Sequence, residues 1–471
     1  MKNIYKYLLT LVFALCCAAG ASAQMKTSYF MEGSIPRYEM NAALTPMHNY
    51  VNMPLLPIGY MGINLNNNFL SVKNFIYPYQ GGHVTALHGS VSAKDFLNRI
   101  PSTASMGADV VYSLVGFGKY NKKHDYFWSF GLNARVIADT GIPKEVFSIL
   151  KDLKSGVYDI PDITISTTAY LEFALGFTMP VGWQNLVVGG RLKLLAGLAQ
   201  AEATLTNLNL TVATDKVRAS YGGNMQGNIF GMDYTDLNDE EGKMDFGELT
   251  NFSDRFRFGN GFKSFGAAVD IGAEAKFLDN RLKVSLALND LGFIKWGAGN
   301  AFQGSLKDVA YEFAGYNTTT EDWEVTKPEG DAFEARHTGN DGYSKRLATT
   351  LNIGAEYNFF DNLLGVGLLS HTKFSNRVTY SELTLVGTVR PSDWFTASIS
   401  QSMVHNNIGI FGLAVNFHPK GVNFFLGVDY VAAQLAQLDF VSEGFKYPLR
   451  AKSMNVYIGL AFTPGGRSKP W

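Results

Sequence analysis

The stretch KSFGAAVDIGAEAKFLDNRLKVSLALNDL, residues 263–291, decides the fold. Apolar side chains stand at every second position from Phe265 to Phe277, and the positions between them are mostly small, polar or charged. This alternation predicts a β-strand with one apolar and one polar face. After a turn at Leu278-Asp279-Asn280 the alternation resumes at Leu282. The stretch therefore predicts a hairpin of two long antiparallel strands.

Two folds use such strands. In a soluble sandwich the apolar face covers a core, whereas in a membrane barrel it faces lipid and strands of about 9 to 11 residues cross the bilayer. Comparable alternating segments occupy residues 105–118, 126–137, 169–178, 186–194, 351–359, 364–368, 378–390, 394–404, 411–417, 422–430 and 452–463. So many long strands favour the barrel, because a sandwich core would have to hide all their apolar faces.

The turns give the strand number. Short turns near residues 122, 182, 279, 361, 392 and 420 join strands in pairs, and 452–463 closes the chain. Bacterial single-chain barrels have even strand numbers, so one more strand is needed, from 58–65 or 84–91. We expect an all-β fold, a single closed antiparallel transmembrane barrel of about 14 strands (about 12 to 16), over residues 57–471. Two polar stretches are expected to be long extracellular loops: 207–261 and 297–346.

The N-terminus predicts export. A positively charged start, an apolar run from Leu8 to Ala19 and the small residues Ala21-Ser22-Ala23 indicate a signal peptide over residues 1–23. No apolar run of 18 residues follows, which argues against a membrane-spanning helix. The formal net charge of -1 gives no electrostatic case for a nucleic-acid partner. The expected location is the cell outer membrane.

Residues 24–56 lack clean periodicity and carry Pro54 near their end. They are expected to form a packed N-terminal segment, either a plug inside the barrel or a clasp on its periplasmic side.

Aromatic residues are expected at both membrane interfaces, where rings with a polar tip are favoured. The periplasmic girdle would contain Trp183, Phe277, Phe359, Phe360, Trp394, Phe395, Phe417 and Phe462. The outer girdle would contain Phe262, Phe293, Trp296, Phe374 and Tyr430.

Motifs for catalysis are lacking. The sequence has no G-x-S-x-G elbow, no P-loop and no H-E-x-x-H, and its eight histidines are scattered without metal-ligand spacing. We therefore expect no enzyme activity, no cofactor and no metal.

The polar face of the strands carries charges of both signs. They are Glu172, Arg191, Lys193, Asp270, Glu274, Lys276, Arg281, Lys283, Glu356 and Asp429. Mixed signs inside a closed barrel are typical of a salt-bridged network that braces strands or holds a plug. A selectivity ring is the alternative, although such rings tend toward one sign.

The chain resembles a known group of proteins in the segments SYFMEGS (28–34), Pro36-Arg37, Asn41-Ala42-Ala43-Leu44 and the Phe-Phe-Asp-Asn hairpin at 359–362. It resembles an uncharacterised family of Bacteroidetes outer-membrane barrels and, more distantly, the FadL/PorV-type transporter superfamily. That resemblance implies a 14-stranded barrel with an N-terminal segment inside it. The plug motif it points to comprises Arg37, Asn41 and Ala43, with Ala42 where the superfamily often has proline.

Two functions follow as expectations. One is FadL-like passive transport of small hydrophobic molecules, with Met225, Ile229, Phe230, Met232 and Tyr234 as candidates for apolar pockets under the outer loops. The other is a non-transporting barrel that scaffolds secretion or presents loops at the cell surface. A secreted soluble β-protein remains a third possibility. The expected partners are outer-membrane lipid, a small hydrophobic ligand and, through the C-terminal strand, the barrel-assembly machinery.

Overall fold

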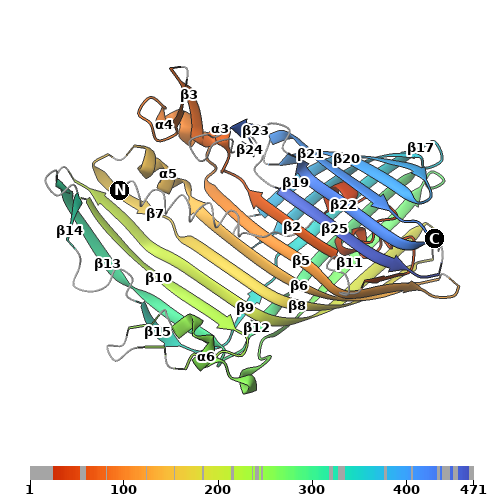
Figure 1. Ribbon diagram of the computed structural model, residues 1–471, viewed down its shortest axis with the longest axis horizontal. Helices are drawn as coiled ribbons and strands as arrows, with labels where there is room; N and C mark the ends of the chain where they lie inside the picture. The colour runs from red at the N-terminus through yellow and green to blue at the C-terminus, as the bar shows by residue number, and fades with distance from the viewer. Residues whose placement is uncertain are drawn as a thin grey trace.

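The computed structural model shows a closed antiparallel β-barrel (Figure 1). It describes residues 25–52, 60–80, 82–123, 125–152, 154–182, 185–213, 217–235, 237–238, 243–245, 248–317, 322–326, 335–375, 379–404, 407–431, 435–437, 446–448 and 454–465. The predicted signal peptide and Trp183 lie outside the described residues.

Fourteen strands form the barrel, as the sequence predicts. They are β2 (Tyr60–Asn67), β5 (Thr103–Tyr120), β6 (Phe127–Pro143), β8 (Ile163–Pro180), β9 (Leu186–Val212), β11 (Phe265–Phe277), β12 (Leu282–Trp296), β17 (Thr349–Phe359), β18 (Leu364–Phe374), β19 (Thr379–Ser392), β20 (Phe395–Val404), β21 (Asn407–Phe417), β22 (Gly421–Val431) and β25 (Met454–Thr463). Each pairs with its neighbours, and β2 pairs with both β5 and β25. This last pairing closes the sheet.

The first barrel strand begins earlier than predicted. A short strand, β1 (Tyr50–Asn52), also pairs with β5 and β25. Pairing with the wall thus starts inside the range 24–56 that was assigned to the plug or clasp, because three residues are too few for alternation to be visible. Of the two candidate first strands, 58–65 matches β2, whereas 84–91 lies at a separate hairpin of β3 (Ile76–Tyr79) and β4 (Gly82–Thr85).

The stretches predicted to be long loops contain much of a tall extension of the sheet. It comprises β7 (Gly156–Ile160), the upper part of β9, β10 (Val217–Ile229), β13 (Ala301–Asn317), β14 (Asp322–Thr326), β15 (Ala335–Gly339) and β16 (Tyr343–Arg346). The loop prediction is wrong here because polar residues and irregular pairing hide the alternation. Asn207 has a left-handed φ of 54°, and the β9–β10 register shifts between Ser220 and Gly222.

Helical turns and small sheets complete the chain. They are η1 (Lys26–Ser28), α2 (Arg37–Met40), α3 (Val72–Phe75), α4 (Ala93–Leu97), α5 (Lys144–Lys151), η2 (Glu248–Thr250), α6 (Phe252–Arg255), η3 (Phe258–Asn260), and the hairpin of β23 (Leu435–Gln437) and β24 (Lys446–Pro448). Helices α3, α4 and α5 cover an apolar cluster that includes Phe69, Phe96 and Phe147. In Figure 1 these helices lie at the end of the barrel that carries the tall extension, here called the extension end. No helix among the described residues is long and apolar enough to cross a membrane.

The opposite end carries tight turns and is here called the short-turn end. Leu278, Asp279 and Asn280 all have positive φ, between 54° and 66°, and link β11 to β12. Phe360-Asp361-Asn362 repeats this conformation between β17 and β18, with φ from 50° to 74°. Asp and Asn tolerate the left-handed region better than most residues, which explains why both turns contain them.

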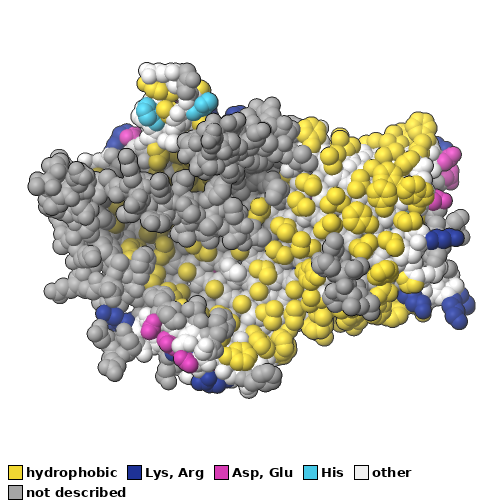
Figure 2. Space-filling model, viewed as in Figure 1, with side chains coloured by type: hydrophobic (Ala, Val, Ile, Leu, Met, Phe, Trp, Pro, Cys, Tyr) yellow, Lys and Arg dark blue, Asp and Glu magenta, His cyan; other side chains and the backbone are white. Residues whose placement is uncertain are grey.

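The outer face of the barrel is apolar. Figure 2 shows a broad band of hydrophobic side chains, with charged side chains toward the two ends. On β11 the exposed side chains run from Phe277 through Ile271 to Phe265. Twelve residues of strand span about 40 Å, or about 30 Å along the barrel axis at a tilt of 35–45°. This height matches the hydrocarbon core of a bilayer.

Two aromatic residues predicted for the outer girdle face inward instead. Trp296 is 0% exposed and Tyr430 is 3% exposed, whereas Phe262, Phe293 and Phe374 are exposed as expected. The reason is a bulge in each strand. Asp290 and Tyr430 have φ of 58° and 68°, and the pairing register shifts beside each of them, so the alternation changes phase.

The lipid-facing assignment predicts a depth-dependent cost of charge. Ile271→Arg, at mid-height of the apolar band, should destabilise the folded barrel by about 2–4 kcal/mol in a bilayer, whereas Leu278→Arg in the adjoining turn should cost about 0–1 kcal/mol. Urea titrations of protein folded into vesicles measure both. Equal costs at the two positions would contradict a membrane-facing outer surface.

Candidate functional site

Residues 25–49 lie inside the barrel and are here called the plug. Almost all are buried, including Tyr29, Asn41 and Ala42 at 0% exposure. Of the two alternatives for the N-terminal segment, the structure shows the inward plug and not a clasp. The predicted plug residues Arg37, Asn41 and Ala43 are all buried within it.

Ion pairs join the plug to the barrel wall. Lys26 pairs with Glu382, Glu32 with Lys283, Arg37 with Glu274 at 3.8 Å, and Glu39 with Arg191 at 2.5 Å. These wall residues lie on β9, β11, β12 and β19, so the plug is held from several sides of the lumen.

The wall also satisfies the plug backbone. The short turns of the plug pair only some of its own carbonyl groups, and the other buried carbonyls need donors. Met40 O accepts from the side-chain amides of Asn289 (2.7 Å) and Asn352 (2.9 Å). Ala42 O accepts from the Thr178 hydroxyl at 2.6 Å. The plug is therefore built into the wall rather than loosely contained by it.

The plug backbone touches the wall where the wall has glycine. A Cβ on Gly189 would lie 2.1 Å from Ala42 O, and a Cβ on Gly272 would lie 2.1 Å from Asn41 Oδ1. The same Asn41 oxygen accepts from Ala43 N at 2.9 Å, which fixes the local turn. Larger wall residues at these two positions would push the plug away.

Asp429 and its neighbours hold the start of the plug. The Asp429 carboxylate accepts from the backbone N–H groups of Lys26 (3.1 Å) and Thr27 (3.0 Å) and from Asn455 Nδ2 (2.6 Å). The Lys26 ammonium meets Glu382, which also accepts from the Tyr430 hydroxyl. Because Tyr430 points inward, its hydroxyl group can donate to Glu382.

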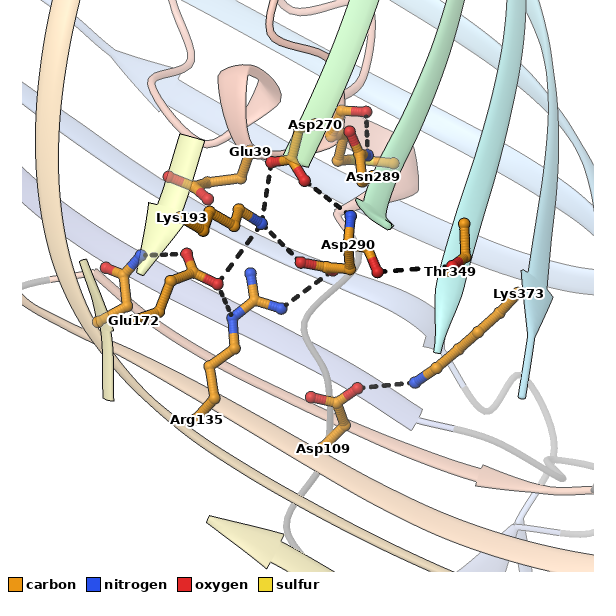
Figure 3. A network of polar contacts seen from close by, with 12 residues as sticks. Glu39, Asp109, Arg135, Glu172, Lys193, Asp270, Asn289, Asp290, Thr349 and Lys373 are labelled. Carbon is orange, nitrogen blue, oxygen red and sulfur yellow. Dashed lines mark hydrogen bonds and ion pairs between the residues drawn. The ribbon is translucent and has the colours of Figure 1, made fainter. Parts of the chain in front are cut away.

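A charged network lies beside the plug (Figure 3). Lys193 Nζ is at its centre, 2.6 Å from Asp290, 2.9 Å from Asp270 and 3.5 Å from Glu172. Arg135 contacts Glu172 at 3.1 Å and Asp290 at 3.4 Å. Arg191 contacts Asp270 at 2.5 Å as well as Glu39 of the plug. The lumen charges therefore form paired contacts of mixed sign rather than a ring of one sign.

Most of the predicted lumen residues lie in the lumen, but one does not. Buried inside are Glu172, Arg191, Lys193, Asp270, Glu274, Glu356 and Asp429, while Lys276 and Lys283 are half-buried. Arg281 is exposed in the short turn before β12 begins. Its assignment to the lumen was wrong because the alternation was extended into the left-handed turn, where it does not apply.

Several site residues were not predicted. Asp290 was missed because it sits in the bulge that breaks the alternation. Asp109 and Lys373 were missed because the pattern gave no pairing between distant strands. Lys373 could have been predicted to face inward, since the alternation of β18 continues past Leu368 and places residue 373 on the inward face.

Asp109 and Lys373 form a bridge across the lumen. Lys373 Nζ lies 2.8 Å from Asp109 Oδ2. Asp109 belongs to β5 and Lys373 to β18, and six strands separate β5 from β18 in either direction around the barrel. The two side chains therefore reach each other from opposite walls, as Figure 3 shows. The ion pair therefore spans the lumen at this level.

A small cavity lies between the plug and this bridge. It measures about 50 Å³ and is lined by Glu39 and Met40 of the plug together with Asp109, Arg135 and Lys373 of the wall. A water molecule needs about 10–15 Å³ of such space, so the cavity holds only a few waters. Val111, Ile137 and Tyr170 also line it, so its surface is both charged and apolar.

The predicted apolar pocket residues are packed against one another. Met232 and Tyr234 are both 0% exposed and form a cluster with Phe302, against which Met225 and Ile229 pack. This cluster lies on the outer face of the extension, because the alternate residues of β9 and β10, Glu202 and Gln226, face inward. The side chains therefore form a filled core, and Phe230 contacts Phe262 beside it at a centroid separation of 4.6 Å.

Among the described residues, no group of three or more His, Cys, Asp or Glu is placed to hold a metal ion.

The network predicts a large effect of removing its central cation. Lys193→Met should destabilise the barrel by about 3–5 kcal/mol, because it leaves buried carboxylates without their shared partner. Unfolding titrations in vesicles measure the change. Lys154→Met, which removes a solvent-exposed contact with Asp152, is the control and should leave stability unchanged. A Lys193→Met variant as stable as the control would show that the network does not brace the barrel.

Acid should weaken one plug contact. Burial would raise the pKa of Glu32, but the cations of Lys283, Arg390 and Arg37 hold it well below its usual range. A lowered pKa in the folded state means that this stabilisation is present above about pH 4.3, the pKa of an unperturbed Glu, and is lost as the pH falls below it.

Protease protection of the plug should therefore be constant from pH 7 to pH 5 and should decline in stronger acid. In the Glu32→Gln variant the plug should be less protected from protease at pH 7. The decline in protection that comes from protonation of Glu32 should be missing in this variant. The same acid profile in both proteins would contradict the assignment.

Comparison with solved structures finds barrels of similar layout. A mutant of the monoaromatic hydrocarbon channel TodX has 8% identity and a TM-score of 0.40, with 91% of this chain and 92% of that chain covered. The toluene transporter TodX of Pseudomonas putida has 8% identity and a TM-score of 0.35, with 94% of each chain covered. The translocator domain of the autotransporter NalP of Neisseria meningitidis has 8% identity and a TM-score of 0.28, with 93% and 98% covered. At these TM-scores the likeness says nothing of what this barrel carries.

No curated protein matches the sequence. A family model matches residues 42–429, which cover most of the barrel together with the end of the plug. The chain therefore belongs to the family of unknown function DUF5723.

Proposed function

We propose that the protein is a gated outer-membrane channel for small molecules, in which the plug and the Asp109–Lys373 bridge close the lumen in series. The observation that carries this proposal is the polar character of both closures. Two side chains from opposite walls meet at 2.8 Å above a plug that is itself held by ion pairs. Such contacts exchange readily for contacts with water when a lumen hydrates, because the attraction between charges falls steeply with dielectric constant.

The plug has an anchored part and a part that polar contacts hold. Met25, Tyr29, Phe30 and Met31 join an apolar cluster with wall residues such as Phe425 and Tyr457. From Glu32 to Glu39, Glu32, Arg37 and Glu39 make ion pairs and Gly33 O accepts a hydrogen bond, while Ile35 and Tyr38 pack in a smaller apolar cluster with Phe127. In this proposal the second part moves and the first part stays, so that the plug is not lost when the channel opens.

The lumen favours a polar or amphiphilic solute. The cavity between the two closures is lined by charged groups together with apolar ones, and the residues expected to form apolar pockets are packed into a filled core. A small hydrophobic ligand, which the sequence suggested, therefore has less support than a solute that can replace charge contacts along the lumen.

Weakening the plug should increase opening. Wild-type protein in planar bilayers should show rare openings, and Lys283→Met, which removes the partner of Glu32, should raise the open probability about tenfold, as expected for a change of about 1.4 kcal/mol. Arg281→Gln, in the exposed turn of the same hairpin, is the control and should match wild type. Deletion of residues 25–45 should leave the bridge as the remaining closure.

A charge swap tests that bridge. In the deletion background Lys373→Met should increase conductance further, and the double change Asp109→Lys with Lys373→Asp should restore the closure. Absence of any conductance in wild type, in Lys283→Met and in the folded deletion variant that also carries Lys373→Met would rule out a channel.

The second candidate is a scaffold or surface-interaction protein. One observation favours it: strands β10 and β13 pair with each other over eleven residue positions and so extend the sheet beyond the barrel. In that case bound partners should be lost when this extension is shortened, and no variant should conduct. Recognition of the closing strand β25 by the barrel-assembly machinery stays a prediction under either function.

A further inference from the structure

Three exposed cations lie together on the outer face near the extension end. They are Lys263, just before β11, Lys295 on β12 and Arg346 at the end of β16. Strand pairing sets their spacing. Lys295 is directly opposite Phe265 on one side and Ser344 on the other, and Arg346 is opposite Phe293.

The third cation continues this row. A Cβ on Gly297 would lie 2.8 Å from Lys263 Cβ, so Lys263 stands opposite Gly297, two residues beyond Lys295. Residues directly opposite across neighbouring strands are about 5 Å apart and diagonal neighbours about 7–8 Å apart. The three side chains therefore share one small patch, here called the basic patch.

The basic patch lies at the extension-end edge of the apolar band. Phe265 is twelve residues from Phe277, which places it about 30 Å above the short-turn interface. Lys263 lies two residues further, and Lys295 lies beside Phe265. The exposed rings of Phe262, Phe265 and Phe293 border the patch. This is the depth at which lipid headgroups begin.

No described carboxylate forms an ion pair with the cations of the basic patch. Lys263 Nζ donates to Asn260 Oδ1 at 2.7 Å, an uncharged partner. Within the part of the chain that the structure describes, Lys263, Lys295 and Arg346 take part in no ion pair, in contrast to the paired cations of the lumen.

We propose that the basic patch binds the phosphate groups of an anionic glycolipid in the outer leaflet, of the lipid A type. This inference rests on the outer-membrane location in the proposed function, but not on channel activity. Arg346, at one end of the row, offers a planar pair of donors suited to phosphate oxygens, and the two lysines add point charges along the rest of it. The bordering phenylalanine rings contact the acyl chains below. The site fixes the height of the barrel and its extension relative to the outer leaflet.

The test uses purified full-length protein in detergent and lipid A as the probe, with bound lipid counted by native mass spectrometry. Wild type should bind phosphorylated lipid A, and the variant Lys263→Gln/Lys295→Gln/Arg346→Gln should bind it about 100-fold more weakly, at about fivefold per cation. The matched control is Lys119→Gln/Lys122→Gln/Lys123→Gln, which removes three exposed cations at the short-turn end and should bind like wild type.

Two further binding measurements identify the ligand. Lipid A without phosphates should bind all three proteins equally weakly, and inorganic phosphate should not displace the phosphorylated form at millimolar concentration. Unchanged binding by the basic-patch variant, or equal binding of the two lipids by wild type, would overturn the proposal. Displacement by inorganic phosphate would overturn the lipid assignment. Conductance of the variant should equal that of wild type, so a failure here is separable from a failure of the channel proposal.

Discussion

A sheet whose outer face meets lipid must close on itself, because an open edge would leave backbone groups without partners in the hydrocarbon. Closure of fourteen strands encloses their polar faces, and the rest of this structure follows from that enclosure. Glu172 and Asp270 are fully buried inside the barrel, and a buried carboxylate is costly unless a cation meets it. Lys193, which contacts both, is therefore a requirement of the closed sheet.

The plug, which is the N-terminal segment, is subject to the same requirement that buried polar groups have partners. Its irregular backbone could not be buried alone, so wall side chains donate to its carbonyl groups and wall glycines let it approach. Its charged residues pair with wall charges that would otherwise face each other or water. The plug therefore combines apolar clusters, which anchor it, with ion pairs that water can replace.

The sequence predicted the architecture well because the barrel rests on simple alternation. In the hairpin of 265–296 the positions of Ile271, Glu274 and Leu286 follow from parity alone, and the repeated Asp-Asn turns mark its ends. The alternation no longer predicts which way a side chain points where the chain departs from regular strand geometry. The bulges at Asp290 and Tyr430 reverse the direction of later side chains, the left-handed turn removes Arg281 from the lumen, and irregular pairing hides β10 and β13. The bridge between Asp109 and Lys373 depends on the barrel's cross-section, which no local pattern encodes.

Hydrogen exchange of residues 25–49 in protein reconstituted into bilayers tests the central claim, that the closed sheet is filled by its own N-terminal segment through contacts with the wall. The account predicts that amides from Lys26 to Met31 exchange as slowly as those of the barrel strands, and that amides from Gly33 to Glu39 exchange faster but still well below the rate of a free peptide. Exchange of the whole segment at the rate of an unstructured peptide would contradict it.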